Sequence, residues 1–259
     1  SLILTHVGRH RELYQLYHGV ALHRALHQPD GLLAMGGDLS VTRLQHAYRS
    51  GVFPWFSDGD PLLWWTPSTR AVFAPGDLQL NRSLRKYQKQ QQFRYSRNLA
   101  FADVIAHCAA LPRRQQAGTW IVDEMQQAYL ALHQAGLAHS IEVWRDQKLV
   151  GGLYGVMIGG LFCGESMFNR LPDTAKLALV ALQHLLQQAT EGWIDCQMPN
   201  PFLLQLGAQS LPRADYVRLL QASAVRHTPA SAVCIERFPL RHTPLRCGPG
   251  WRGLRRQVS

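Results

Sequence analysis

Residues 53–67, FPWFSDGDPLLWWTP, constrain the fold of this chain more than any other segment. They contain three Trp, two Phe and three Pro in fifteen positions. Each proline removes a backbone donor and restricts the residue before it, so the segment is excluded from a regular helix. We therefore expect a rigid aromatic loop. With 259 residues, 46% of them hydrophobic, the chain is long enough for a sizeable core and for one large or two modest domains.

The basic residues are concentrated in two segments of a chain whose net charge is +10. Residues 78–114 carry eight basic residues against Asp103, and residues 226–259 carry seven arginines against Glu236. The remainder is mildly acidic. Such clustering indicates a polyanionic partner, although basic residues that merely solubilise a surface would give the same count.

Other classes of protein are disfavoured by composition. The sequence has no stretch of about 18 apolar residues, and its first residues are of mixed polarity, so we expect a soluble cytoplasmic protein without membrane association. Its five cysteines are an odd number without a C-x-x-C pair, which argues against a disulfide framework or a zinc cluster. The twelve histidines form no H-x-x-x-H or H-E-x-x-H pair on a predicted helix, so we predict no metal.

Helices are predicted from capping residues and spacing. Ser40 caps a helix through Tyr48, and Asn81 caps a short helix on which four cations share one face, at Arg82, Arg85, Lys86 and Lys89. Further helices are predicted over residues 122–134, from residue 173 or 174 to 188, and over 212–221. The long apolar helix from 174 is expected to be buried against a sheet.

That sheet is predicted from alternation and turn residues. Strands over 140–145, 149–157 and 161–167 are separated by an Asp-Gln turn and a Gly-Gly turn, which is typical of an antiparallel meander. Residues 193–197 form the next strand. The two-residue period there places Asp195 and Gln197 on one face.

A carboxylate and an amide side by side at a strand end can orient an attacking amine and stabilise an oxyanion, but a strand-end Asp is more often a turn or cap residue. Glu165 lies in an otherwise apolar strand, where it must face solvent or have a partner, so a paired structural role is the alternative. Cys163 and Cys196 are weaker candidates, since buried strand cysteines are usually inert.

Seven motifs in order along the chain resemble the bacterial leucyl/phenylalanyl-tRNA–protein transferases. They are GLLAMGGDLS (31–40), GVFPWFS (51–57), WWTP (64–67), GTWI (118–121), HSIEVW (139–144), FCGESMF (162–168) and IDCQ (194–197). Several are long and rare, so chance similarity is implausible.

The resemblance implies an α+β fold with three parts. These are a small N-terminal domain over residues 1–70, of which 1–28 match nothing in the family, a catalytic domain over 71–225 resembling the N-acetyltransferase (GNAT-like) fold, and a basic, disordered tail over 226–259. It also implies an aminoacyltransferase that moves Leu, Phe or Met from charged tRNA to proteins with N-terminal Arg or Lys. That transfer marks those proteins for degradation by the N-end rule pathway. The resemblance implies no cofactor, and we expect a monomer.

The resemblance also implies roles for individual residues. Asp195 and Gln197 would be the catalytic pair, Glu165 and Asn200 would bind the acceptor, and Trp55 and Trp120 would contact the terminal adenosine of the tRNA. The cationic stripe would bind the acceptor stem. The pocket for the transferred side chain would be formed by Leu153, Phe162, Met167, Leu179, Leu182, Leu186 and Ile194.

Two other functions compete with this one. The first is an acetyl-CoA-dependent N-acetyltransferase, which would need a glycine-containing pyrophosphate loop that residues 169–176 lack. The second is a non-enzymatic tRNA-binding protein, which would leave Asp195, Gln197 and Glu165 without a role. The chain also departs from the family motif at Phe202, where a His is usual, and at Gln205, which begins the run QLGA in place of SLGA.

Overall fold

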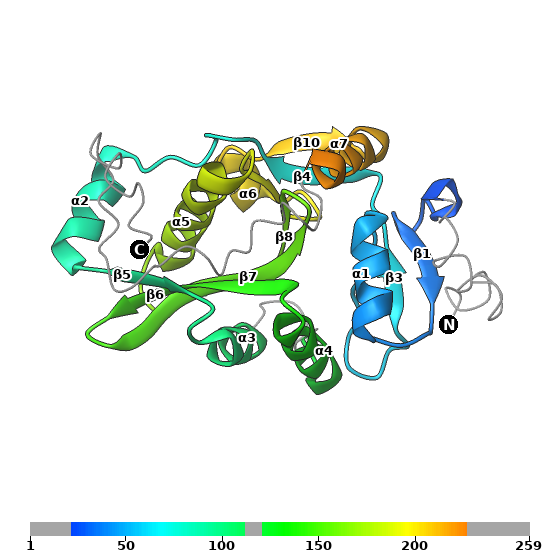
Figure 1. Cartoon of the computed structure of the whole chain (residues 1–259), viewed down its shortest axis with the longest axis horizontal. Coiled ribbons are helices and arrows are strands. Elements are labelled where there is room, and N and C mark those ends of the chain that lie inside the picture. Colours follow the sequence, from blue (N-terminus) through cyan, green and yellow to red (C-terminus); the bar gives the residue numbers. More distant parts are fainter. Residues whose placement is uncertain (1–21, 112–120, 227–259) are drawn as a thin grey trace, which may run out of the picture.

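The computed structural model describes residues 22–111 and 121–226, which form two sheets. The smaller sheet is antiparallel, in the order β1 (Leu32–Met35), β3 (Leu63–Trp65) and β2 (Phe53–Pro54). Helix α1 (Val41–Arg49) packs beside this sheet, at the right of Figure 1. A 3₁₀ turn over Leu22–Arg24 precedes β1 in the chain.

The larger sheet has seven strands in the order β10-β4-β9-β8-β7-β6-β5. Their bounds are β4 (Thr69–Phe73), β5 (Arg94–Arg97), β6 (Ala138–Arg145), β7 (Lys148–Ile158), β8 (Leu161–Asn169), β9 (Trp193–Asp195) and β10 (Gln209–Pro212). Strands β8 and β9 are parallel and are joined through helix α5 (Thr174–Ala189), while the other neighbouring pairs described are antiparallel. The predicted α+β class and the antiparallel meander, β6 to β8, are confirmed.

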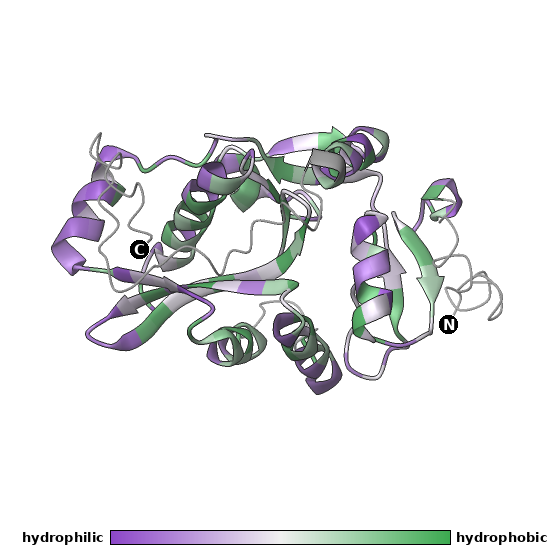
Figure 2. Cartoon of the chain, in the orientation of Figure 1, coloured by the Kyte–Doolittle hydropathy of each residue, from purple (hydrophilic) through white to green (hydrophobic). Residues whose placement is uncertain are grey.

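Helices cover both faces of the larger sheet (Figure 1). On one face α5 packs on β6, β7 and β8, and on the other lie α3 (Phe101–Ala109) and α4 (Asp123–Gln134). Each face has its own hydrophobic cluster, and the cluster with α3 and α4 continues into α1 and the smaller sheet. Figure 2 shows apolar residues on α5 and on the strands below it, whereas α2 (Arg82–Gln91) is largely hydrophilic. Helices α6 (Pro201–Gln205) and α7 (Arg213–Arg226) complete the fold.

The predicted helix starts are confirmed by their caps. The Ser40 side chain accepts a hydrogen bond from the backbone nitrogen of Arg43 at 3.3 Å, and that of Asn81 accepts one from Leu84 at 2.8 Å. Each cap satisfies one of the donors that the first turn leaves without a helical partner. The helices predicted over 122–134, 174–188 and 212–221 correspond to α4, α5 and α7.

The prediction of a loop throughout residues 53–67 is wrong at both ends of that segment. Phe53 pairs with Trp65 and Pro54 with Trp64, so β2 and β3 form a short hairpin. A proline is tolerated there because β2 is the edge strand of its sheet, where a missing donor costs no ladder hydrogen bond. The indole of Trp65 donates to the carbonyl of Trp55 at 2.6 Å, which fixes the turn between the strands.

The expected domain division is only partly visible in the described residues. The boundary between residues 70 and 71 falls inside β4, which belongs to the larger sheet. Residues 1–21 lie outside the described part of the chain. So does the expected basic tail, apart from Arg226 at the end of α7. The division and the disorder of the tail stay predictions.

A β-bulge positions Glu165. Tyr154 on β7 pairs with Ser166 on β8, but the next residue, Gly155, pairs with Gly164, so Glu165 is the extra residue of the ladder. Bulges of this kind redirect a side chain. Gly155 permits the close approach, because a Cβ at this position would collide with the carbonyl of Cys163 and lie 2.6 Å from the ring of Phe162.

We expect Gly155→Ala to lower the free energy of unfolding by about 1–3 kcal/mol, the usual cost of overpacking. Gly164→Ala is the matched control across the ladder, because its Cβ would lie 3.3 Å from the nearest atom, the carbonyl of Asp195. The control should stay within about 1 kcal/mol of the wild type. Urea denaturation of both variants gives the comparison, and equal stability would contradict this account of the bulge.

Candidate active site

Asp195, at the end of β9, is fully buried and surrounded by hydrogen-bond donors. Arg70 on β4 donates to both carboxylate oxygens, from Nε to Oδ1 at 3.1 Å and from Nη2 to Oδ2. The hydroxyl of Tyr216 on α7 donates to Oδ2 at 2.9 Å, and the backbone nitrogen of Gln197 donates to Oδ1 at 2.9 Å. A buried carboxylate needs such partners, because an unpaired buried charge is very costly.

Arg70 connects this carboxylate to the smaller sheet. Its Nη1 donates to the carbonyl of Gly51 at 3.1 Å. Its guanidinium lies 4.2 Å from the ring centre of Tyr216 and 4.9 Å from that of Phe53, distances at which a cation is attracted to an aromatic face. Burial by itself would lower the pKa of Arg70, but the charge of Asp195 outweighs it and holds that pKa above its ordinary value. Arg70 is therefore a permanent cation in the core.

Gln197 lies close to Asp195, but not for the predicted reason. Strand β9 ends at Asp195, and Gln197 has a φ of 62°, so the alternation of a strand does not extend to it. The two residues are joined instead by a turn in which the Asp195 side chain accepts from the Gln197 backbone. The Gln197 carbonyl accepts from Ala71 at 2.9 Å, and its side-chain Nε2 donates to Glu165 Oε1 at 2.9 Å.

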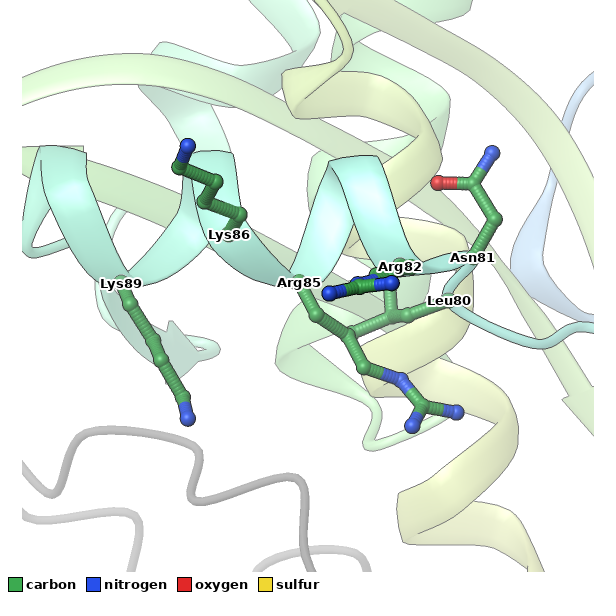
Figure 3. Close-up of a pocket in the computed structure, with 6 residues that line it drawn as sticks. All are labelled: Leu80, Asn81, Arg82, Arg85, Lys86 and Lys89. Carbon is green, nitrogen blue, oxygen red and sulfur yellow. The ribbon is translucent and has the colours of Figure 1, made fainter.

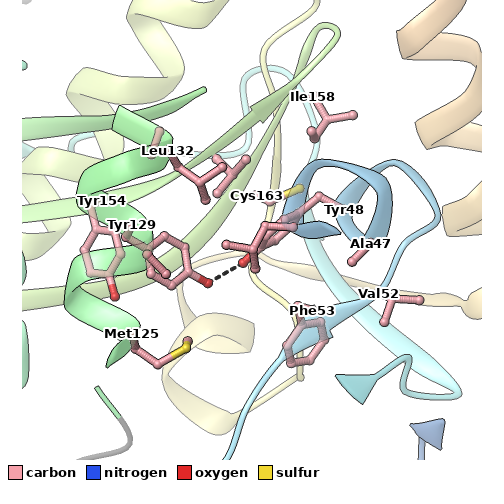
Figure 4. Close-up of a cluster of buried hydrophobic side chains, with 14 of the residues drawn as sticks. Ala47, Tyr48, Val52, Phe53, Met125, Tyr129, Leu132, Tyr154, Ile158 and Cys163 are labelled. Carbon is pink, nitrogen blue, oxygen red and sulfur yellow. Dashed lines mark hydrogen bonds between the residues drawn. The ribbon is translucent and has the colours of Figure 1, made fainter. Parts of the chain in front are cut away.

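Glu165 accepts hydrogen bonds from two helices and from the turn that follows β9. Tyr48 on α1 donates to Oε1 at 2.5 Å, Tyr129 on α4 donates to Oε2 at 2.9 Å, and Gln197 completes the set. The two phenol oxygens are themselves 2.5 Å apart, and Figure 4 shows them facing each other within the apolar cluster. Asp195, Gln197 and Glu165 thus form one polar group.

Burial raises the pKa of Glu165 to about 7, although hydrogen bonds from Tyr48, Tyr129 and Gln197 oppose the shift. Burial, with the charge of Glu165, also raises the pKa of both tyrosines well above the ordinary value. The tyrosines therefore stay protonated donors at neutral pH, where Glu165 itself changes charge. A group of this kind can hold a cation or exchange a proton.

Other predicted site residues lie in several places. Asn200 is exposed and caps α6, where its Oδ1 accepts from the backbone nitrogen of Leu203 at 3.0 Å. Trp55 is half-buried and meets Trp65 edge to face, with ring centres 5.5 Å apart. Trp120 lies outside the described residues.

The four cations of α2 are all exposed and share one surface. Arg82, Arg85, Lys86 and Lys89 line a shallow hollow of about 630 Å³ together with Leu80 and Asn81 (Figure 3). Within the described ranges these cations belong to no ion pair within 4.0 Å. An array of cations that are not neutralised by carboxylates suits a phosphate backbone.

The seven predicted pocket residues do come together in one hydrophobic cluster. Six are buried and Met167 is partly buried. They come from β7, β8, α5 and β9, and Leu153 and Phe162 pair across the ladders with Met167 and Ile194. All seven side chains are apolar.

Neither cysteine near the site has the environment of a nucleophile. Burial raises the pKa of Cys163 and that of Cys196, to which the charge of Asp195 adds. Within residues 22–111 and 121–226, no group of three His, Cys, Asp or Glu side chains is placed to hold a metal ion. In the same ranges no helix is both long and apolar enough to cross a bilayer.

Four residues of this site were not identified from the sequence. They are Arg70, Tyr216, Tyr48 and Tyr129. Each lies between 21 and 125 residues along the chain from its carboxylate partner, and on a different helix or strand. One signal in the sequence was usable for these residues: Glu165 lies in an otherwise apolar strand, where a carboxylate that does not face solvent needs a hydrogen-bonding partner. That signal predicts that partners exist but does not name them.

Comparison with known proteins decides the family. A family model described as leucyl/phenylalanyl-tRNA protein transferase matches residues 72–221, and a model of its N-terminal domain matches residues 37–68. The chain belongs to this family. A leucyl/phenylalanyl-tRNA–protein transferase of Shewanella halifaxensis is 54% identical over 197 residues, which cover 76% of this chain and 83% of the relative. One of Shewanella oneidensis is 54% identical over 196 residues, with the same coverage of each chain.

Solved structures resemble the fold more distantly. A conserved protein of Staphylococcus epidermidis has a TM-score of 0.40 at 8% identity and covers 70% of this chain and 68% of its own. A GCN5-related N-acetyltransferase-like protein of Streptococcus suis has a TM-score of 0.30 at 14% identity, with 64% of each chain covered. The family assignment rests on the sequence relatives. It makes the chain an aminoacyltransferase that acts on aminoacyl-tRNA and a protein substrate.

We expect Tyr129→Phe to raise the pKa of Glu165 above about 7, because the lost hydrogen bond stabilises the ionised carboxylate. The carboxyl carbon of ¹³C-labelled glutamate, followed by NMR from pH 4 to 9, reports the change. Tyr95→Phe, at a buried tyrosine on β5, is the control and should leave the titration unchanged. A Glu165 midpoint that falls or stays fixed in Tyr129→Phe would show that this hydroxyl does not support the charge.

Proposed function

We propose that this aminoacyltransferase moves Leu, Phe or Met from charged tRNA to proteins that begin with Arg or Lys, and so marks them for degradation by the N-end rule pathway. The observation that carries the proposal is the polar group formed by Gln197, Glu165 and Asp195, together with a hydrophobic cluster that gathers the seven predicted pocket residues. The polar group offers hydrogen-bonding partners for an amine and an oxyanion, and the hydrophobic cluster suits an apolar side chain. The reaction needs no cofactor, and we propose a cytoplasmic monomer.

The chemistry is aminolysis of an activated ester. The neutral α-amine of the acceptor attacks the carbonyl carbon of the aminoacyl ester and a C–N bond forms. The C–O bond to the tRNA ribose breaks, and the proton that the amine loses is balanced by the proton that the departing ribose oxygen takes up as it becomes a hydroxyl. Because the ester is already activated, orientation and oxyanion stabilisation matter more than a strong base. Gln197 is the group that we propose to touch the reacting atoms. Asp195 has no exposed surface, so we assign it the positioning of Gln197 rather than direct contact with the amine.

Glu165 is proposed to bind the acceptor. The carboxylate of this half-buried residue would pair with the cationic end of an N-terminal Arg or Lys, and we propose that the exposed Asn200 also contacts the acceptor. With a pKa of about 7, Glu165 is roughly half ionised at neutral pH, so acceptor binding should strengthen as the pH rises through 7. Loss of the proton from Glu165 is what supplies the negative charge.

The donor, the charged tRNA, is proposed to contact three regions of the protein. Trp55 and Trp120 would stack on the terminal adenosine, a contact worth about 1 to 3 kcal/mol whatever the tRNA sequence. The stripe on α2 would bind phosphates of the acceptor stem. The proposed pocket would select Leu, Phe and Met, since none of its seven side chains carries a polar group that could read a hydroxyl.

The acetyl-CoA alternative is disfavoured by the start of α5. In N-acetyltransferases a helix N-terminus of this kind keeps backbone amides open for pyrophosphate. Here the Asn169 side chain accepts from the backbone nitrogen of Ala175 at 2.7 Å, so one of the amides at that end is already bound by the chain itself. A tRNA-binding protein without activity would leave the buried polar group at Gln197 unused.

The proposed function is tested by incubating the protein with tRNA charged with radiolabelled Phe and a peptide that begins with Arg. We expect label to move to the peptide at its α-amine. The same peptide with an acetylated N-terminus is the control and should take up none. Acetyl transfer from acetyl-CoA, or tRNA binding without transfer, would replace the proposal with one of the two alternatives.

The α2 stripe predicts the salt dependence of tRNA binding. Arg82→Gln combined with Arg85→Gln should weaken binding and lower the log-log salt slope by about 1.8, taking roughly 0.9 per phosphate contact as for B-DNA. Arg82→Lys combined with Arg85→Lys keeps both charges and should keep the slope. If the slope of the Gln pair equals that of the wild type, these cations form a solvated surface instead.

A further inference from the structure

We propose that Arg70 is a positioning residue for the transfer reaction, and that it acts through Asp195 on Gln197. The inference rests on the proposed role of Gln197 and adds a residue that belongs to none of the motif matches. Arg70 lies on β4 and has no route to the substrate, since it is about 1% exposed. Its influence must therefore pass through the groups that it contacts.

The contacts of Arg70 form a fork that fixes the Asp195 carboxylate in one orientation. Nε and Nη2 bind the two oxygens of the carboxylate, and Nη2 also donates to the hydroxyl of Tyr216 at 3.2 Å. A planar guanidinium can hold a carboxylate in this bidentate way, and an ammonium cannot. The plane of the carboxylate is therefore set by Arg70.

The Asp195 carboxylate, held in this orientation, fixes the backbone turn that contains Gln197. Oδ1, which accepts from Arg70 Nε, also accepts from the backbone nitrogen of Gln197 at 2.9 Å. Gln197 has a φ of 62°, a conformation that non-glycine residues adopt at some cost, so it needs contacts that hold it. Rotation of the carboxylate would release the backbone and move the side-chain amide away from Glu165.

Arg70 also ties this turn to the segment that carries Trp55. Its Nη1 binds the carbonyl of Gly51, and its guanidinium lies over the ring of Phe53, two residues before Trp55. One buried side chain thus contacts both the turn proposed to bear the reacting amide and the segment proposed to bind the tRNA end. This arrangement predicts a loss of rate when the fork is removed, even if the charge is kept.

The test is a double-mutant cycle on the full chain, with the single-turnover transfer of Phe to an Arg-initial peptide as the readout. Arg70→Lys keeps the cation, so Asp195 is not left unpaired, but it lacks the fork. We expect Gln197→Ala to lower the rate by about 10² or more, and Arg70→Lys by about 10 to 10². In the Gln197→Ala background, Arg70→Lys should lower it less than about twofold, since the group that it positions is gone.

A merely structural loss would behave differently, because it would lower the rate by the same factor in both backgrounds. That result would overturn the role of Arg70 and leave the role of Gln197 intact. Near wild-type turnover of Gln197→Ala would overturn the proposed catalytic role itself. The two failures are therefore distinguishable.

Arg213→Lys is the matched control, because Arg213 also donates from its guanidinium to backbone carbonyls, those of Pro67 and Leu22, but does not contact Asp195. We expect it to retain the wild-type rate. If Arg70→Lys does not fold, as judged by its thermal unfolding, Tyr216→Phe takes its place in the cycle. It removes one donor from Asp195 and should show the same dependence on Gln197, with a smaller loss.

Discussion

The buried ion pair between Arg70 and Asp195 is the interaction on which the site depends. Removing two charges from water is costly, and the cost is offset here because both carboxylate oxygens and the guanidinium are hydrogen-bonded. The pair joins β4 and β9 of the larger sheet, together with helix α7, to Gly51, which lies two residues before β2 of the smaller sheet. It is therefore both a junction between the two sheets and the support of the Gln197 turn.

A second polar cluster meets the first at Gln197. Glu165 accepts hydrogen bonds from hydroxyl groups on α1 and α4. Its position in the bulge of β8 also directs its carboxylate toward the side-chain amide of Gln197. The two carboxylates differ in kind. Asp195 is fixed beside a permanent cation, whereas Glu165 is partly exposed with a pKa of about 7 and can change charge during a reaction at neutral pH. That division suits one structural carboxylate and one that meets the substrate.

Local patterns predicted much of this fold but not the contacts of the site. Caps at Ser40 and Asn81 and the turns of the meander are encoded within a few residues, so they could be predicted. Arg70 and Asp195 are 125 positions apart, and no local pattern pairs them. The predicted strand alternation correctly placed Gln197 near Asp195, but the reason was wrong. Gln197 lies in a turn after β9, and the two-residue period of a strand does not show where the strand ends. Resemblance to a family supplied the function.

The most direct test of this account is amide hydrogen exchange at Gln197, measured by NMR in the wild type and in Arg70→Lys. The Gln197 backbone nitrogen donates to Asp195, so the wild type should show slow exchange there. We expect exchange at Gln197 to accelerate by about tenfold or more in Arg70→Lys, while the amides of β7 and β8 keep their protection. Equal protection at Gln197 in both proteins would contradict the claim that Arg70 holds this turn.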